Sequence, residues 1–165
     1  MLPLQTERLT IRELVAGDLD ELADIYADPK VRWWERRRSR ETRHAAIDAS
    51  LERYRRAGMG EYAVLLRAGG RLIGVGGPAL REIEGDCLPE LGWELRSDQW
   101  GHGCATEAAA GTLTHAVDLG LPRVYSLIVP DDVRSQGVTR RIGMTIQRQV
   151  TWSDRPHDLW ARDLP

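Results

Sequence analysis

Two glycines in three residues, Gly101 and Gly103, separate a strand-like segment (87–97) from an alanine-rich run (104–119) of helical character. A helix that begins directly after such a turn leaves its first four backbone N–H groups unpaired. These amides and the partial positive charge of the helix start form a natural seat for an anion. The other interpretation is a plain turn into a packed helix.

The rest of the chain alternates between helical and strand-like periodicity without a linker, repeat or low-complexity tail. The expected order is strand, two helices, three strands, helix, strand, helix and two strands. Asp18 and Glu21 have the spacing of a capping box at the start of the first helix. The pattern predicts a single domain over residues 1–165, of α/β or α+β class, with a mixed sheet.

Composition excludes several classes of protein. The net charge of −2 argues against a protein built mainly to coat nucleic acid. Two cysteines, Cys87 and Cys104, do not make a secreted disulfide framework. There is no apolar run of about 18 residues to span a membrane, and the first residues lack the apolar core of a signal peptide. Together these features lead us to expect a cytoplasmic protein without a membrane partner. The histidines have no metal-ligand spacing, so we expect no metal.

Two other phosphate-binding motifs compete for the glycine turn. A P-loop requires a lysine directly after its last glycine, and no lysine lies near. A dinucleotide-binding loop requires a third glycine, but Thr106 stands in that place. Asp131 and Asp132 end the next strand, where a ribose-binding acid would lie, so the dinucleotide interpretation stays open.

The stretch ELGWELRSDQWGHGCATEA (90–108), followed by RVYSLIVPDDVRSQGVTRRIGM (123–144), resembles the GNAT superfamily of acetyl-CoA-dependent N-acetyltransferases. It is most similar to the branch that holds ribosomal-protein N-terminal acetyltransferases, as is the opening LQTERLTIREL (4–14). The resemblance implies a GNAT-like fold: a central mixed, twisted sheet of about seven strands with helices on both faces. It also implies that the sheet is splayed between the strands at 88–96 and 123–129.

The family's pyrophosphate loop has the pattern Gln/Arg-x-x-Gly-x-Gly/Ala, and WGHGCA (100–105) is similar to it, with Trp100 in the first slot. By this resemblance, the pantetheine arm of acetyl-CoA would pair with the backbone of Trp93 and Leu95. The coenzyme A pyrophosphate would lie on the backbone of Trp100, Gly101, His102, Gly103, Cys104, Ala105 and Thr106.

Amide formation from a thioester requires a neutral amine, so a base must take a proton from the acceptor. Glu90 is the first candidate, and Glu94 lies on the same face of the strand; both could instead point to solvent. The family pattern Pro-x-Asn-x-x-Ser resembles PDDVRS (130–135), which places Ser135 as the acid near the sulfur. The other interpretation of Ser135 is an N-cap or first-turn serine of a short helix. Asp132 takes the place of a cofactor-binding Asn, although a carboxylate cannot donate a hydrogen bond.

The acceptor is expected to be a primary amine that attacks acetyl-CoA directly in a ternary complex. By resemblance it is a protein or peptide N-terminal α-amine; a small amine such as an antibiotic or polyamine is the alternative. Trp33 and Trp34 would wall the acceptor site, although the basic stretch around them is also typical of a solvated face or a nucleic-acid patch. A non-catalytic acyl-CoA-binding regulatory domain is the competing class, and the protein is expected to be a monomer or homodimer.

Overall fold

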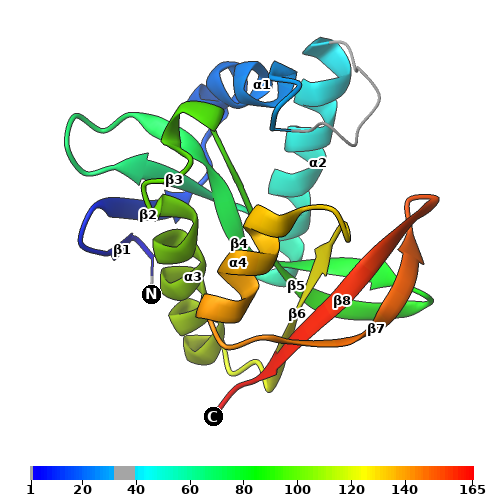
Figure 1. Cartoon of the computed structure of the whole chain (residues 1–165). Coiled ribbons are helices and arrows are strands. Elements are labelled where there is room, and N and C mark those ends of the chain that lie inside the picture. Colours follow the sequence, from blue (N-terminus) through cyan, green and yellow to red (C-terminus); the bar gives the residue numbers. More distant parts are fainter. Residues whose placement is uncertain (1, 32–39) are drawn as a thin grey trace.

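The computed structural model describes residues 2–31 and 40–165. Within them, eight strands form one sheet, and helices lie on both of its faces (Figure 1). The strands are β1 (Leu4–Gln5), β2 (Leu9–Glu13), β3 (Tyr62–Leu66), β4 (Leu72–Ile83), β5 (Asp86–Leu95), β6 (Arg123–Ile128), β7 (Thr145–Trp152) and β8 (Arg155–Asp163). The helices are α1 (Leu19–Ala27), α2 (Arg40–Ala57), α3 (Cys104–Asp118) and α4 (Val133–Arg141), with short 3₁₀ turns at Ala16–Asp18 and Ser97–Gln99.

The predicted elements are confirmed in type and order. The sheet has eight strands where about seven were expected, because β1 has only two residues and is too short to give a periodic pattern. None of the described helices is both long enough and apolar enough to cross a membrane.

The strand order is β1-β2-β3-β4-β5-β6-β8-β7, and every neighbouring pair is antiparallel except β5 and β6. These two parallel strands share a single partner pair, Glu90 with Tyr125. By contrast, β4 and β5 pair continuously from Gly74–Leu95 to Ile83–Asp86. The sheet is therefore splayed between β5 and β6, as the family resemblance implies, and we call this opening the fork.

Alternating side chains of β3 show how the sheet is covered. Tyr62 and Val64 pack with Ala108 of α3 on one face. Ala63 packs on the other face with Leu22 of α1 and Ile47 of α2. The period of two along the strand thus gives each face its own apolar layer, with α3 and α4 on one side and α1 and α2 on the other.

The alanine-rich run of α3 allows the helix to lie close to the sheet. Ala108, Ala109 and Ala116 are fully buried. A methyl group on Gly111 would lie 3.1 Å from a side-chain carbon of Thr6, so a larger residue there would push the helix away. Small residues on this helix therefore fix the distance between the glycine turn and the strands.

The predicted capping box at the first helix is wrong. Asp18 gives no capping hydrogen bond to α1. Its carboxylate accepts two hydrogen bonds of 2.8 Å from the Arg12 guanidinium and one of 2.9 Å from the Val15 N–H. A charged partner on the neighbouring strand β2 outcompetes the helix amides for this buried carboxylate.

Candidate active site

The glycine turn presents bare backbone at the start of α3. Gly101 and Gly103 have φ of +79° and +81°, a conformation that side chains disfavour. Gly103 is the N-cap of α3, and no side chain caps this helix end. Among the described residues, no side chain occupies the first N–H groups of α3, so they can bind a ligand, as the anion-binding interpretation of the glycine turn requires.

A cavity of about 960 Å³ lies against this turn and reaches β5 and the start of α4. Nine predicted cofactor residues line it: Trp93, Leu95, Trp100, Gly101, Gly103, Cys104, Ala105, Thr106 and Asp132. Ser135 lines it as well. His102 is not among the lining residues; its backbone carbonyl accepts a hydrogen bond from the Arg8 guanidinium.

Several lining residues were missed by the sequence analysis, among them Glu7, Arg8, Lys30, Val31, Arg134, Arg141 and Glu107. Five of these seven stand in the stretches quoted for the family resemblance: Glu7 and Arg8 in 4–14, Glu107 in 90–108, and Arg134 and Arg141 in 123–144. Those stretches were therefore a signal for these five residues. Lys30 and Val31 lie outside them.

The backbone of β5 borders the cavity where the fork opens. The Leu91 carbonyl accepts a 2.6 Å hydrogen bond from the Ser126 hydroxyl on β6. The Leu95 carbonyl accepts one of 2.9 Å from the Trp100 indole N–H. Trp100 therefore ties the glycine turn to the strand that would hold an extended ligand arm.

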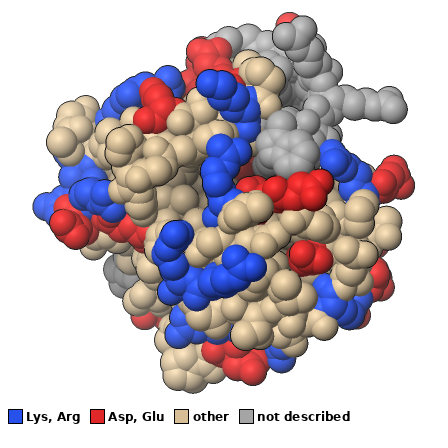
Figure 2. All heavy atoms as spheres, in the orientation of Figure 1, with Lys and Arg blue, Asp and Glu red and all other residues tan. Residues whose placement is uncertain are grey.

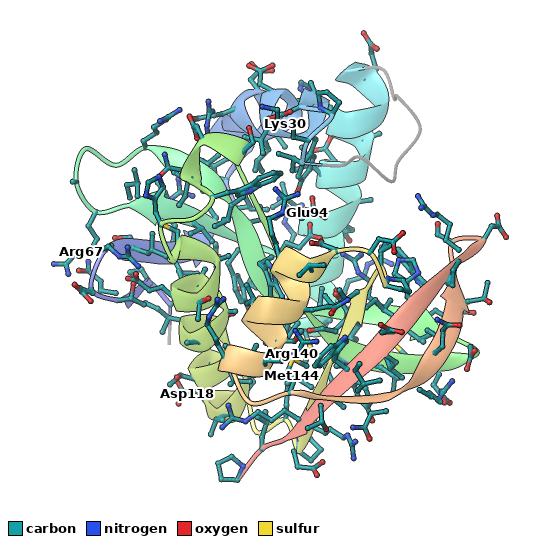
Figure 3. All side chains as sticks on the ribbon, in the orientation of Figure 1. Lys30, Arg67, Glu94, Asp118, Arg140 and Met144 are labelled. Carbon is teal, nitrogen blue, oxygen red and sulfur yellow. The ribbon has the colours of Figure 1, made fainter. Side chains whose placement is uncertain are left out.

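The two candidate bases lie on one face of β5 but in different surroundings. Glu94 lines the cavity, and in the view of Figure 3 it lies between Lys30 and α4. Glu90 does not line the cavity; it stands at the last strand pair before the fork, and its side chain is only 14% exposed. Burial raises the pKa of the Glu90 carboxyl above its usual value, against the opposing effects of Arg81 and the Leu127 N–H.

The sequence profile of the acetyltransferase (GNAT) domain matches residues 8–145. This chain belongs to the GNAT family and is an acetyltransferase. It is 26% identical over 140 residues to the uncharacterized N-acetyltransferase p20 of Bacillus licheniformis, a match that covers 80% of this chain and 76% of that protein.

Solved structures share the whole GNAT fold. An acetyltransferase from Agrobacterium tumefaciens str. C58 superposes with a TM-score of 0.87 at 27% identity, over 99% of this chain and 95% of that one. A RimL ribosomal L7/L12 alpha-N-protein acetyltransferase in complex with coenzyme A superposes with a TM-score of 0.81 at 16% identity, over 98% and 97%. GNAT acetyltransferases use acetyl-CoA and acylate an amine.

The cavity fits this substrate. No atom outside its chain neighbours lies within 4 Å of a methyl group placed on Gly101, so the loop is open on its outer side. Cationic side chains from three parts of the GNAT domain line the same cavity: Arg8, Lys30, Arg134 and Arg141. Figure 2 shows blue side chains gathered near the middle of this face. Bare amides and nearby cations are the groups that bind a diphosphate.

Arg134 and Trp100 join α4 to the glycine turn across this cavity. The Arg134 guanidinium carbon lies 3.9 Å from the centre of the Trp100 ring. This stacked cation–π geometry holds a positive charge beside the bare amides while leaving the outer N–H groups of the guanidinium for another partner.

Asp132 is the N-cap of α4, and Ser135 lies in the first turn of this helix. One Asp132 carboxylate oxygen accepts the Ser135 backbone N–H at 3.1 Å, and the other accepts the Ser135 hydroxyl at 2.8 Å. Ser135 is thus a first-turn serine, as the alternative interpretation allows, and its hydroxyl still stands at the cavity wall. An aspartate caps a helix as well as the asparagine of the family pattern.

The predicted acceptor residues Trp33 and Trp34 lie outside the described residues. Across residues 2–31 and 40–165, no three His, Cys, Asp or Glu side chains gather as metal ligands would. Cys104 is buried under the start of α3, and Cys87 is exposed at the far end of β5.

Proposed function

We propose that this acetyltransferase modifies a protein or peptide N-terminal α-amine, by direct attack on acetyl-CoA in a ternary complex. The observation that carries the proposal is the continuity of the cavity from the bare amides at Gly101 and Gly103 to the carboxylate of Glu94. The fold shared with a ribosomal L7/L12 alpha-N-protein acetyltransferase supports an α-amine as the acceptor.

The first-turn amides of α3 and the side chain of Arg134 would bind the diphosphate, and the backbone of Trp93 and Leu95 would orient the pantetheine arm. The thioester would then lie in the fork between β5 and β6. Water is displaced from this opening when the arm is bound, so a backbone N–H that meets the developing oxyanion stabilises it more than water would.

Glu90 is proposed as the base. It takes a proton from the acceptor ammonium, directly or through one water, and the free amine attacks the thioester carbon. The nitrogen then gives its second proton to water, the C–S bond breaks and the sulfur leaves as a thiolate. A raised pKa brings the Glu90 carboxyl closer to the acceptor's, which favours proton transfer near neutral pH.

Glu94 and Ser135 have supporting roles in this proposal. The Glu94 carboxylate lines the cavity and would attract the acceptor while it is still an ammonium. The Ser135 hydroxyl, which lines the cavity, would give the thiolate its proton and take one back from water. This step is a minor one, because a thiol has a pKa near 8.5 and leaves readily.

The test is a thiol-release assay with acetyl-CoA and a panel of amines. We expect turnover with peptides that carry a free α-amine, and none with the same peptides after N-terminal blocking, even when they contain lysine. Glu90→Gln should lower kcat/KM by roughly 10²-fold or more. Glu52→Gln, an exposed carboxylate on α2, is the matched control and should leave kcat/KM unchanged.

Other outcomes decide between the alternatives. Turnover of a polyamine or aminoglycoside with no turnover of peptides would replace the α-amine acceptor by a small molecule. Tight binding of coenzyme A with no turnover of any amine would identify a binding module. Thermal protection by NAD and none by coenzyme A would support the dinucleotide interpretation.

A further inference from the structure

Three charged side chains meet at the base of the fork, on the face of the sheet that carries α1 and α2. Arg81 of β4 donates from Nη2 to a Glu61 carboxylate oxygen at 2.7 Å. Its Nε lies 3.5 Å from a Glu90 carboxylate oxygen. All three side chains are largely shielded, with exposed fractions of 25% for Arg81, 19% for Glu61 and 14% for Glu90.

This arrangement is a costly way to stabilise a fold. Each ion loses hydration when it is shielded, and a one-to-one pair only offsets that loss when its geometry is good. Here two carboxylates contact one guanidinium, and the charge of Glu61 acts against the ionised form of Glu90. Glu94, further along β5, adds to the negative field around Arg81. The cluster is therefore better explained by what it does to Glu90 than by stability.

The geometry aims the Glu90 carboxylate at the fork. Glu90 pairs with Tyr125 at the last point where β5 and β6 are bonded. The backbone N–H of Leu127, two residues further along β6, favours the ionised form of this carboxylate. A methyl group on Gly92, two residues further along β5, would lie 3.3 Å from a Glu90 carboxylate oxygen. The side chain thus leans toward the opening, with Arg81 on β4 beside it.

The groups that act on Glu90 come from each strand around it. Among the described residues they are the Arg81 guanidinium from β4, the Glu61 carboxylate from the residue before β3, and the neutral Leu127 N–H from β6. Arg81 favours the ionised form of Glu90, and Glu61 disfavours it. The two residues act on the Glu90 pKa in opposite directions, so replacing one or the other should shift that pKa in opposite directions.

We propose that Arg81 is a positioning residue for acetyl transfer: it holds Glu90 ionised and directed into the fork, while Glu61 anchors Arg81 and limits its effect. The proposal rests on the function proposed above, in which Glu90 is the base. Arg81 itself touches no reacting atom in this role. It acts through the carboxylate that it contacts.

The experiment measures kcat/KM against pH for the wild type, Arg81→Gln, Glu61→Gln and the double variant. Without Arg81, Glu90 accepts a proton more readily, so the acidic limb of the profile should move up by about one pH unit. Without Glu61, the limb should move down. In the double variant, the limb should return toward the wild-type position. If Arg81 only stabilised the fold, its substitution would lower kcat/KM at all pH values without moving the limb.

Two further measurements make every outcome informative. Carbon-13 titration of the Glu90 carboxyl in the wild type and in Arg81→Gln reads the same effect without any acceptor. Arg81→Lys keeps the charge and is the matched control, whose limb should lie within a few tenths of a unit of wild type. Arg81→Met also removes the charge, and it replaces Arg81→Gln if that variant does not fold. Binding of coenzyme A should be the same in all these variants.

If the variant without the Arg81 charge has the wild-type midpoint in the titration, or the wild-type acidic limb, the role of Arg81 is overturned. If only the limb is unmoved while Glu90→Gln is inactive, the function proposed above stands and this inference alone fails. If Glu90→Gln keeps wild-type turnover, the base assignment fails first, and the carbon-13 titration then decides whether Arg81 controls the ionisation of Glu90.

Discussion

Arg8 and Glu107 stand 99 positions apart in the chain and form an ion pair at the start of α3. The Arg8 Nε donates to one Glu107 carboxylate oxygen at 2.7 Å, and the Arg8 backbone N–H donates to the other at 2.7 Å. The Thr6 hydroxyl donates to the same carboxylate, and the Arg8 guanidinium also reaches the His102 carbonyl in the glycine turn. These contacts therefore connect the edge of the sheet to the glycine turn.

Glu107→Gln should loosen this connection. The variant loses a charge-assisted network and leaves Arg8 without its anionic partner, which should lower the free energy of unfolding by about 1–3 kcal/mol in a urea titration. Because the glycine turn is held through Arg8, the affinity for coenzyme A should fall as well. An affinity equal to that of the wild type would show that the loop keeps its shape without the ion pair.

The same pair predicts a pH dependence. Burial acts to raise the pKa of the Glu107 carboxyl, but hydrogen bonds from Thr6 and Arg8 hold it below its usual value. A depressed folded-state pKa gives stability that is complete above the unfolded pKa, about 4.3, and is lost as pH falls through the folded value. The stability difference between wild type and Glu107→Gln should therefore shrink as the pH is lowered through this range. A difference that stays constant contradicts the assignment.

Gly103→Ala should weaken coenzyme A binding. Its φ of +81° costs an alanine about 1–2 kcal/mol, and the added methyl would lie 3.1 Å from the Arg8 guanidinium, beside the bare amides. Gly120→Ala at the other end of α3 is the matched control, with φ of +71° and open space around it. Calorimetry should find similar losses of stability in both variants, and a loss of affinity only in Gly103→Ala. Equal affinities would remove the loop from the binding site.

The sequence predicts those features of the site that are local. The glycine turn, the helix after it and the parallel strands around the fork each have a pattern within about 20 neighbouring residues, and the structure confirms these elements. The predicted capping role of Asp18 was wrong because its partner Arg12 lies in another element. The capping pattern takes account only of the residues in the helix that follows.

The rest of the site depends on contacts that have no periodic signature. Arg81 meets Glu61 and Glu90 only because β3, β4 and β5 pair in one register. Arg134 reaches Trp100 only because α4 crosses beside the turn. A charged residue on a strand or helix has the same local pattern whether it faces solvent or a distant partner, so these roles appear only in three dimensions.

Arg134→Gln should lower the affinity for coenzyme A roughly fivefold, as expected for the loss of one partly solvated ionic contact. The remaining binding should depend less on salt, because one fewer cation faces the diphosphate. Arg140→Gln is the control on the same helix: its guanidinium lies 5.4 Å from the Trp160 ring centre, and Arg140 is not a cavity-lining residue. Equal salt dependence in the two variants would place the diphosphate away from Arg134.

Two substitutions of Asp132 distinguish a role in helix capping from a role in cofactor binding. Asp132→Asn keeps an acceptor for the Ser135 N–H, so stability should stay within a few tenths of a kcal/mol of wild type. Asp132→Ala removes the cap and should cost about 1 kcal/mol in urea unfolding. If the residue at this position also touches coenzyme A, Asp132→Asn should tighten binding, because the amide adds a donor and removes a negative charge near the diphosphate. Unchanged affinity in Asp132→Asn, together with the loss of stability in Asp132→Ala, would limit Asp132 to holding α4 and Ser135 in place.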